Sequence, residues 1–199
     1  MPLRIQSVHL NDVVVIAPQP LEDSRGFFME VFRTDQFRNL GLPCDFVQDN
    51  HSRSSKGVLR GIHFQWDPPM GKLMRVTRGA AFMVAVDVRK HSPTLAQWFG
   101  MEVSAENKLQ IWAPYGFARG FCALTDICEV QYKCTGLYNP KGESAIHFAD
   151  PDIGIQWPMD LKSAIVSEKD RTAQSLAQWL ASPLSDEVIY HKELTAKEA

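Results

Sequence analysis

Hydrophobic residues alternate with small or polar residues between positions 80 and 88, and similar short runs fill the middle of the chain. Phe82, Val84 and Val86 occupy every second position, which is the period of a β-strand. Turn-forming residues such as Asp67-Pro68-Pro69 separate the runs. Many short strands with frequent turn signals are typical of a sandwich or barrel. We expect an all-β fold with strands at residues 13–17, 27–32, 58–65, 73–78, 80–88, 98–104, 109–113, 117–124 and 127–135.

Helical patterns are confined to the two margins of the chain. Residues 34–40 form a short candidate helix before Gly41, and residues 167–180 carry Ala173, Leu176 and Leu180 at helical spacing. A chain of 199 residues suits one domain. The sequence shows no interdomain linker and becomes polar towards its end. We therefore expect one domain over residues 1–184 and a polar tail or loosely attached helix over residues 185–199.

Charge and hydropathy argue against several functional classes. The net charge of -2 provides no basic field for nucleic acid or an anionic membrane. No apolar run approaches the roughly 20 residues that span a bilayer, and the first residues do not resemble a signal peptide. The four cysteines are scattered without a Cys-x-x-Cys pair, which argues against a disulfide framework or a structural zinc site. We expect a cytoplasmic protein.

The segment Arg60-Gly61-Ile62-His63-Phe64-Gln65 combines a cation and an imidazole on a predicted strand, with Lys72 shortly after it. An imidazole can take a proton from an acidified carbon at neutral pH, and a lysine can stabilise the resulting oxyanion. The alternative is a partly buried structural histidine beside two surface cations. Strict alternation would put Arg60 and His63 on opposite faces, but a bulge at Gly61 would bring them together.

Tyr132 lies on the apolar face of its predicted strand, together with Val130 and Cys134. A buried phenol usually needs a hydrogen-bond partner. Tyr132 is therefore either a core tyrosine with a satisfied hydroxyl or a proton donor that lines a cavity.

Several motifs, taken in order, resemble the dTDP-4-dehydrorhamnose 3,5-epimerase family of cupin-type jelly-roll proteins. The resemblance covers residues 23–170, and the order of the motifs is more specific than any one of them. The motifs are Asp23-Ser24-Arg25-Gly26-Phe27-Phe28-Met29-Glu30, Gln48-Asp49-Asn50-His51-Ser52, Arg60-Gly61-Ile62-His63-Phe64-Gln65, Gly71-Lys72-Leu73, Val103-Ser104-Ala105-Glu106-Asn107, Tyr132-Lys133, Asp150-Pro151-Asp152-Ile153-Gly154-Ile155 and Ser167-Glu168-Lys169-Asp170.

The resemblance implies a catalytic set that inverts C3 and C5 of a dTDP-4-keto-6-deoxy-hexose. His63 would be the general base, oriented by Asp170, and Tyr132 the acid on the opposite face of the sugar. Lys72 would stabilise charge on the C4 oxygen. Proton removal from one face and return to the other needs these three roles and neither a metal nor another cofactor.

The resemblance also implies a substrate-binding set and a homodimer with an exchanged N-terminal strand. Arg60, Gln48 and Asn50 would hold the diphosphate and sugar, and Tyr138 would stack on the thymine. Arg25 and Glu30 would reach the nucleotide from the partner subunit. The remaining positions of this set are Phe27, Glu143 and Lys169.

One position departs from the family pattern. The chain has Gly116-Phe117-Ala118-Arg119-Gly120-Phe121 where the family usually has histidine in place of Arg119. Arginine stays protonated and clamps anions well, but it cannot act as a general acid near neutral pH. We expect Arg119 to replace an oxyanion donor and to narrow or re-aim the pocket, which would restrict inversion to one carbon or favour another sugar.

Four alternatives stand beside the 3,5-epimerase. They are a mono-epimerase for C3 or C5, a ketoisomerase on a related nucleotide sugar, a non-catalytic nucleotide-sugar-binding cupin and a metal-dependent cupin enzyme. The metal enzyme would need a cluster such as His-x-His with a carboxylate, whereas Phe64 and Gln65 follow His63. A binding module would not need His63, Tyr132, Lys72 and Asp170 together.

Overall fold

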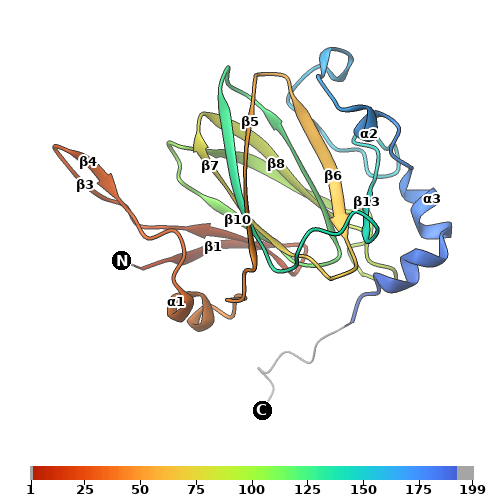
Figure 1. Ribbon diagram of the computed structural model, residues 1–199, viewed down its shortest axis with the longest axis horizontal. Coiled ribbons are helices and arrows are strands. Elements are labelled where there is room, and N and C mark those ends of the chain that lie inside the picture. Colours follow the sequence, from red (N-terminus) through yellow and green to blue (C-terminus); the bar gives the residue numbers. More distant parts are fainter. Residues whose placement is uncertain (1, 192–199) are drawn as a thin grey trace.

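The computed structural model describes residues 2–191 and contains two antiparallel sheets packed face to face (Figure 1). This arrangement confirms the expected jelly-roll fold. The six-stranded sheet has the order β1 (Arg4–His9), β2 (Val13–Ala17), β10 (Gln110–Ala113), β7 (Lys72–Arg78), β12 (Cys128–Cys134) and β5 (Gln48–Ser54). The five-stranded sheet has the order β13 (Glu143–Ala145), β6 (Leu59–Gln65), β11 (Phe117–Ala123), β8 (Ala80–Asp87) and β9 (Trp98–Ser104).

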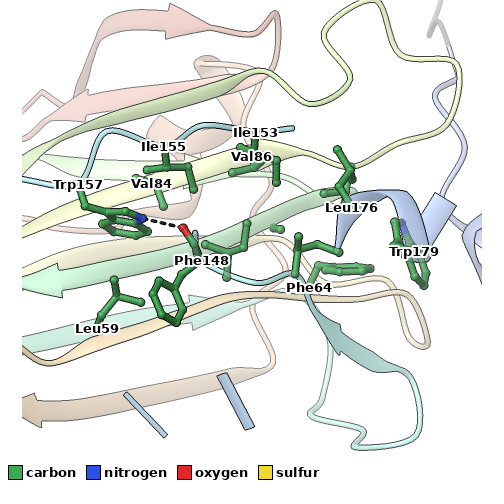
Figure 2. Close-up of a cluster of buried hydrophobic side chains, with 14 of the residues drawn as sticks. Leu59, Phe64, Val84, Val86, Phe148, Ile153, Ile155, Trp157, Leu176 and Trp179 are labelled. Carbon is green, nitrogen blue, oxygen red and sulfur yellow. Dashed lines mark hydrogen bonds between the residues drawn. The ribbon is translucent and has the colours of Figure 1, made fainter. Parts of the chain in front are cut away.

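Strand β8 is buried on both faces, which explains its nearly continuous apolar sequence. Met83 and Ala85 belong to the core between the two sheets. Val84 and Val86 pack on the outer face against the C-terminal segment, which contributes residues such as Ile155, Trp157, Leu176 and Trp179 (Figure 2). The indole Nε1 of Trp157 donates to the Phe148 carbonyl at 2.8 Å. The C-terminal segment therefore completes a second core outside the sandwich.

Strand β5 was not predicted because its sequence, Gln48-Asp49-Asn50-His51-Ser52-Arg53-Ser54, is almost entirely polar. It is an edge strand that pairs only with β12 over residues 48–54. Strand β1 at the other edge was also missed, since all six of its residues are partly or fully exposed. Tertiary pairing, rather than hydrophobic alternation, specifies these edges.

The strand predicted at residues 27–32 is shorter in the structure. Strand β4 (Gly26–Phe28) pairs only with β3 (Leu21–Asp23), in a two-stranded arm that projects from the body (Figure 1). Phe27 and Phe28 are 56% and 65% exposed on this arm. Isolated two-stranded hairpins are marginal in water, so the arm is a candidate contact surface.

Helix α1 (Thr34–Asn39) confirms the first predicted helix, but the second predicted helical stretch is interrupted. It divides into α2 (Glu168–Arg171) and α3 (Leu176–Ala181). Ser175 begins α3 with a capping box to Gln178, and Gln174 forms a bridge to Ile146. These contacts pull the intervening residues away from a helical path. Two short 3-10 helices, η1 (Leu161–Ser163) and η2 (Pro183–Glu187), complete the segment.

The described part of the expected tail packs against the domain. Val188 is fully buried, and its carbonyl accepts a hydrogen bond from the Lys90 backbone at 2.9 Å. The Tyr190 backbone N–H then donates to the Lys90 carbonyl at 2.9 Å. Packed structure thus extends beyond the boundary expected at residue 184, because the apolar side chain of Val188 packs into the outer core. Residues 192–199 of the predicted tail lie outside the described residues.

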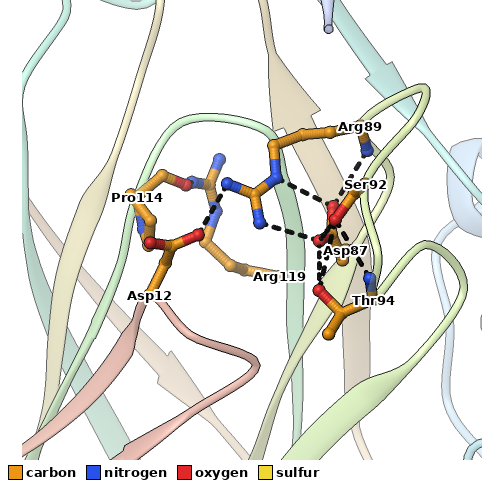
Figure 3. A network of polar contacts seen from close by, with 7 residues as sticks. All are labelled: Asp12, Asp87, Arg89, Ser92, Thr94, Pro114 and Arg119. Carbon is orange, nitrogen blue, oxygen red and sulfur yellow. Dashed lines mark hydrogen bonds and ion pairs between the residues drawn. The ribbon is translucent and has the colours of Figure 1, made fainter. Parts of the chain in front are cut away.

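A buried ionic network lies where β8 ends (Figure 3). The Asp87 carboxylate accepts hydrogen bonds from the guanidinium of Arg89 and the hydroxyls of Ser92 and Thr94. Arg89 also donates to Asp12 in the β1–β2 turn at 2.7 Å. The network therefore fixes the end of β8 against the start of the chain.

Within the described residues, no helix is long and apolar enough to cross a membrane.

Candidate active site

A cavity of about 510 Å³ between the two sheets collects seven of the predicted site residues. The five-stranded sheet contributes Arg60, His63 and Arg119, and the six-stranded sheet contributes Lys72 and Tyr132. The remaining two residues, Lys169 and Asp170, lie on the short helix α2.

His63 and Asp170 are hydrogen-bonded at the cavity wall, with His63 Nε2 at 2.5 Å from Asp170 Oδ1. Asp170 is 3% exposed, and its other oxygen accepts from the Gly61 backbone N–H at 3.4 Å. Burial tends to raise the pKa of Asp170, but the hydrogen bond and charge of His63 outweigh it and lower the pKa below its usual value. The pair therefore holds one ring nitrogen and leaves the other ring atoms to face the cavity.

Ser167 fixes the position of Asp170. Ser167 is the N-cap of α2, and its hydroxyl accepts from the Asp170 backbone N–H at 3.1 Å. A serine before Glu-Lys-Asp is a typical helix start, so this supporting residue could have been found from the sequence.

An irregularity in β6 brings Arg60 and His63 to the same cavity. The register between β6 and β11 pairs Arg119 with His63 and Phe121 with Arg60, so β6 holds one extra residue between them. Gly61 has a φ of +120°, and a Cβ there would lie 2.6 Å from the Cα of Gly120. Only glycine fits this position without strain. The bulge at Gly61, which the sequence left as an open alternative, is therefore present.

Lys72 and Tyr132 face the cavity from the opposite sheet. Lys72 Nζ lies 5.0 Å from the centroid of the Tyr132 ring. Burial, followed by the nearby charge of Arg119, lowers the pKa of Lys72 to about 8. Burial raises the pKa of Tyr132, partly offset by a hydrogen bond from Asn50. At neutral pH the site thus holds a protonated phenol and an ammonium group that is easily deprotonated.

A chain of polar contacts extends from the cavity along its rim. Gln48 donates to Asn50 at 3.0 Å and accepts from the Tyr138 backbone N–H at 2.9 Å. The Tyr138 hydroxyl donates to Glu143 at 3.2 Å, and Glu143 forms an ion pair with Lys169. These five predicted residues are therefore contiguous, and the Tyr138 ring is left 55% exposed.

The predicted residues Arg25 and Phe27 on the arm, and Glu30 just after it, lie away from this cavity. Arg25 forms an exposed ion pair with Asp23 at 2.6 Å, and Phe27 lies under Lys108 Nζ at 5.0 Å from its ring centroid. Glu30 bonds to Arg33 and Gln36 near α1. A single chain does not bring these residues to His63.

The surroundings of Arg119 could not be predicted from the sequence. Its Nη1 donates to the carbonyls of Met70, Ala113 and Pro114, at 2.8, 3.5 and 3.2 Å. These carbonyls come from a strand end and a turn of the other sheet, so no local pattern marks them. Within residues 2–191, no three His, Cys, Asp or Glu side chains gather as metal ligands would.

Comparisons with known proteins agree on one family. The family model described as dTDP-4-dehydrorhamnose 3,5-epimerase matches residues 7–178. A dTDP-4-dehydrorhamnose 3,5-epimerase of Methanothermobacter thermautotrophicus is 49% identical over 176 residues, which cover 88% of this chain and 95% of that protein.

One solved structure and a more distant relative extend the comparison. The crystal structure of a Legionella pneumophila 3,5-epimerase in complex with dTDP-4-keto-L-rhamnose has a TM-score of 0.89 and 41% identity, and covers 96% of this chain and 99% of that chain. A dTDP-4-dehydrorhamnose 3-epimerase of Streptomyces niveus is 34% identical over 178 residues, which cover 88% of this chain and 85% of that protein.

Proposed function

The chain belongs to the dTDP-4-dehydrorhamnose 3,5-epimerase family of isomerases, and we propose that it inverts C3 and C5 of a dTDP-4-keto-6-deoxy-hexose with His63 as base and Tyr132 as acid. The observation that carries this proposal is the origin of the two side chains. His63 lies on β6 and Tyr132 on β12, in opposite sheets, and both line one cavity. A flat sugar ring between two such groups can lose a proton from one face and gain one on the other.

The chemistry follows from the acidity of hydrogens beside a ketone. His63 takes the proton from C3 or C5, and the electron pair of the broken C–H bond forms a double bond to C4. Charge moves onto the C4 oxygen, where the ammonium of Lys72 stabilises it. Tyr132 then gives its proton to the carbon from the opposite face. Asp170 keeps the His63 ring in one orientation and stabilises its charged form.

The remaining residues would hold the nucleotide. Arg60 is exposed at the mouth, and its Nε donates to Ser54, which suits a role in binding the diphosphate. Gln48 and Asn50 would bind the sugar, and the exposed ring of Tyr138 would stack on the thymine. Glu143 and Lys169 complete the rim.

The arm points to a homodimer in which each subunit completes the other's site. Phe27 and Phe28 are large exposed apolar residues, and within the described part of the chain Arg25 bonds to Asp23 of the same arm alone. An arm of this kind gains apolar contacts if it lies across a second copy. Arg25, Phe27 and Glu30 would then reach the partner's nucleotide. We also propose a cytoplasmic location, since four free cysteines suit a reducing compartment.

A second candidate is inversion at a single carbon. Arg119 stands where the family usually has histidine, and a relative that is 34% identical is a 3-epimerase. A bulky guanidinium at the cavity wall would allow one carbon to approach His63 and hinder the other.

Product stereochemistry separates these candidates. The protein is incubated with dTDP-4-keto-6-deoxyglucose, and proton–proton couplings in the NMR spectrum report the configuration at C3 and C5. Inversion at both carbons supports the 3,5-epimerase and removes the case for restriction by Arg119. Inversion at one carbon supports the mono-epimerase, a moved carbonyl supports the ketoisomerase, and unchanged substrate with tight binding would contradict any catalytic role.

A further inference from the structure

Arg119 is a buried cation without an anionic partner. The residue is 4% exposed, and its Nε and Nη2 atoms have no hydrogen-bond partner within residues 2–191. Only Nη1 is satisfied, by the carbonyls of Met70, Ala113 and Pro114. Among the described residues, no carboxylate forms an ion pair with it. A buried charge left unpaired in this way is costly, and local rules of this kind are usually broken at functional sites.

The contacts of Arg119 lead directly to Lys72. Ala113 on β10 is the cross-strand partner of Lys72 on β7, and Met70 precedes Lys72 by two positions. Arg119 itself lies on β11 of the opposite sheet, so its side chain spans the sandwich to reach backbone carbonyls beside Lys72. Figure 3 shows Arg119 beside Pro114, next to the Asp87–Arg89 network at the end of β8.

The electrostatic effect acts on the same residue. Burial lowers the pKa of Arg119 to about 10, which leaves it protonated at neutral pH. After burial, its charge is the next cause that lowers the pKa of Lys72 to about 8. The other groups that act on Lys72 are Cys134 and Glu143, which oppose this effect, and Lys169, which adds to it.

We propose that Arg119 is a positioning residue that makes Lys72 a proton donor to the C4 oxygen instead of a fixed positive charge. The proposal rests on the epimerase function. As His63 takes the proton from carbon, the C4 oxygen gains the carbonyl electron pair and accepts a proton from the Lys72 ammonium, which leaves an enol and a neutral amine. When Tyr132 protonates the carbon, the enol returns its proton to Lys72. A proton donor works best when its pKa is close to the working pH. Arg119 maintains a positive electrostatic potential in the site while Lys72 is neutral.

A direct titration of Lys72 tests the proposal without substrate. The protein is labelled with 13Cε-lysine, the Lys72 signal is assigned from its loss in Lys72→Met, and its chemical shift is followed with pH. We expect a pKa near 8 in the wild type, an increase of about one unit in Arg119→Gln, and a value near the wild type in Arg119→Lys, which keeps the charge. The alkaline limb of the pH–kcat profile should move by the same amount.

Two further variants keep the test decisive. Arg75 lies on β7, the strand of Lys72, and its guanidinium bonds to Gln131. Arg75→Gln therefore removes a different guanidinium and should leave the pKa of Lys72 unchanged. If Arg119→Gln does not fold, Arg119→His supplies a side chain that is neutral above about pH 7.5. An unchanged Lys72 pKa in the uncharged variant would overturn the inference. Failure of the wild type to exchange hydrogen at C3 and C5 would instead refute the proposed function.

Discussion

His63 Nε2 lies 2.5 Å from Asp170 Oδ1, although 107 positions separate the two residues in the sequence. The pairing depends on the short helix α2, which the N-cap Ser167 begins at the cavity mouth. The C-terminal segment therefore has two roles, because it covers the outer core of the five-stranded sheet and also orients the proposed base.

Asp170→Asn should lower kcat by about 10²–10⁴-fold, because loss of the carboxylate removes both the orientation and the charge stabilisation of His63. KM should change much less, since Asp170 is 3% exposed and bonds to His63 rather than facing the open mouth. Steady-state kinetics with the nucleotide sugar measure both values. Asp152→Asn, at an exposed position, is the control and should retain wild-type kinetics. Wild-type kcat in Asp170→Asn would contradict the role of the pair.

Lys72 should impose an alkaline limb on the reaction. Its pKa of about 8 is lowered by burial and by Arg119, so the ammonium form decreases as the pH rises through this value, and kcat should fall with it. Lys72→Met should lose about 10²–10³-fold in kcat and also lose the limb. The exposed Lys141→Met serves as the matched control. If the residual activity of Lys72→Met kept an alkaline limb at the wild-type pH, that limb would belong to the titration of another group.

Asp87→Asn should destabilise the fold by about 3–5 kcal/mol, because Arg89 would be left as a buried charge with a weaker partner. Burial tends to raise the pKa of Asp87, but the bonds from Arg89, Ser92 and Thr94 lower it below its ordinary value. The carboxylate therefore stabilises the fold fully above the unfolded-state pKa of about 3.9 and loses this effect as the pH falls through its lower folded-state pKa. Urea unfolding at pH 7 and at acid pH should show the difference between wild type and variant shrinking on acidification. Exposed Asp126→Asn should have little effect at either pH.

Gly61→Ala should be more damaging than Gly57→Ala. Both glycines have positive φ, at +120° and +86°, but a Cβ at Gly57 meets nothing within 4 Å. We expect a cost of about 1–2 kcal/mol at Gly57 from the backbone alone. At Gly61 a further overpacking cost of about 1–3 kcal/mol should appear against β11. Equal unfolding free energies for the two variants would show that the β6 irregularity is not constrained as described.

The proposed exchange of arms predicts complementation between two inactive variants. An Arg25→Ala chain lacks an arm residue and a His63→Ala chain lacks the base, so each homodimer has two defective sites. A mixed dimer would contain one complete site, made of the His63-bearing body and the Arg25-bearing arm. Random mixing should restore about a quarter of the wild-type sites. Activity no greater than the sum of the separate variants after denaturation and joint refolding would argue against a shared site.

The sequence predicted those elements that have their own hydrophobic pattern. The strands around Val84 and Ile111 were predicted because alternation and turn residues are local signals. Strand β5 was not predicted because polar Gln48-Asp49-Asn50 gains its strand conformation from pairing with β12. The break between α2 and α3 was missed for a similar reason, since Gln174 pairs with Ile146, a partner distant in sequence.

The site shows the same division. Motif order brought His63, Tyr132, Lys72 and Asp170 together as a set before any geometry was known, and the cavity contains all four. The bulge at Gly61 was an open alternative that only the β6–β11 register could decide. The hydrogen bonds that hold Arg119 are accepted by backbone carbonyls, which every residue carries, so no side-chain pattern could indicate them.

Incorporation of deuterium in heavy water tests most directly whether His63 and Tyr132 act on opposite faces of the sugar. The substrate dTDP-4-keto-6-deoxyglucose is incubated with wild type, His63→Ala and Tyr132→Phe, and NMR follows deuterium and configuration at C3 and C5. We predict deuterium exchange with inversion by the wild type and loss of exchange in His63→Ala. In Tyr132→Phe, the rate of inversion should fall more than the rate of deuterium exchange. Exchange at the wild-type rate in His63→Ala, or wild-type inversion in Tyr132→Phe, would contradict the account.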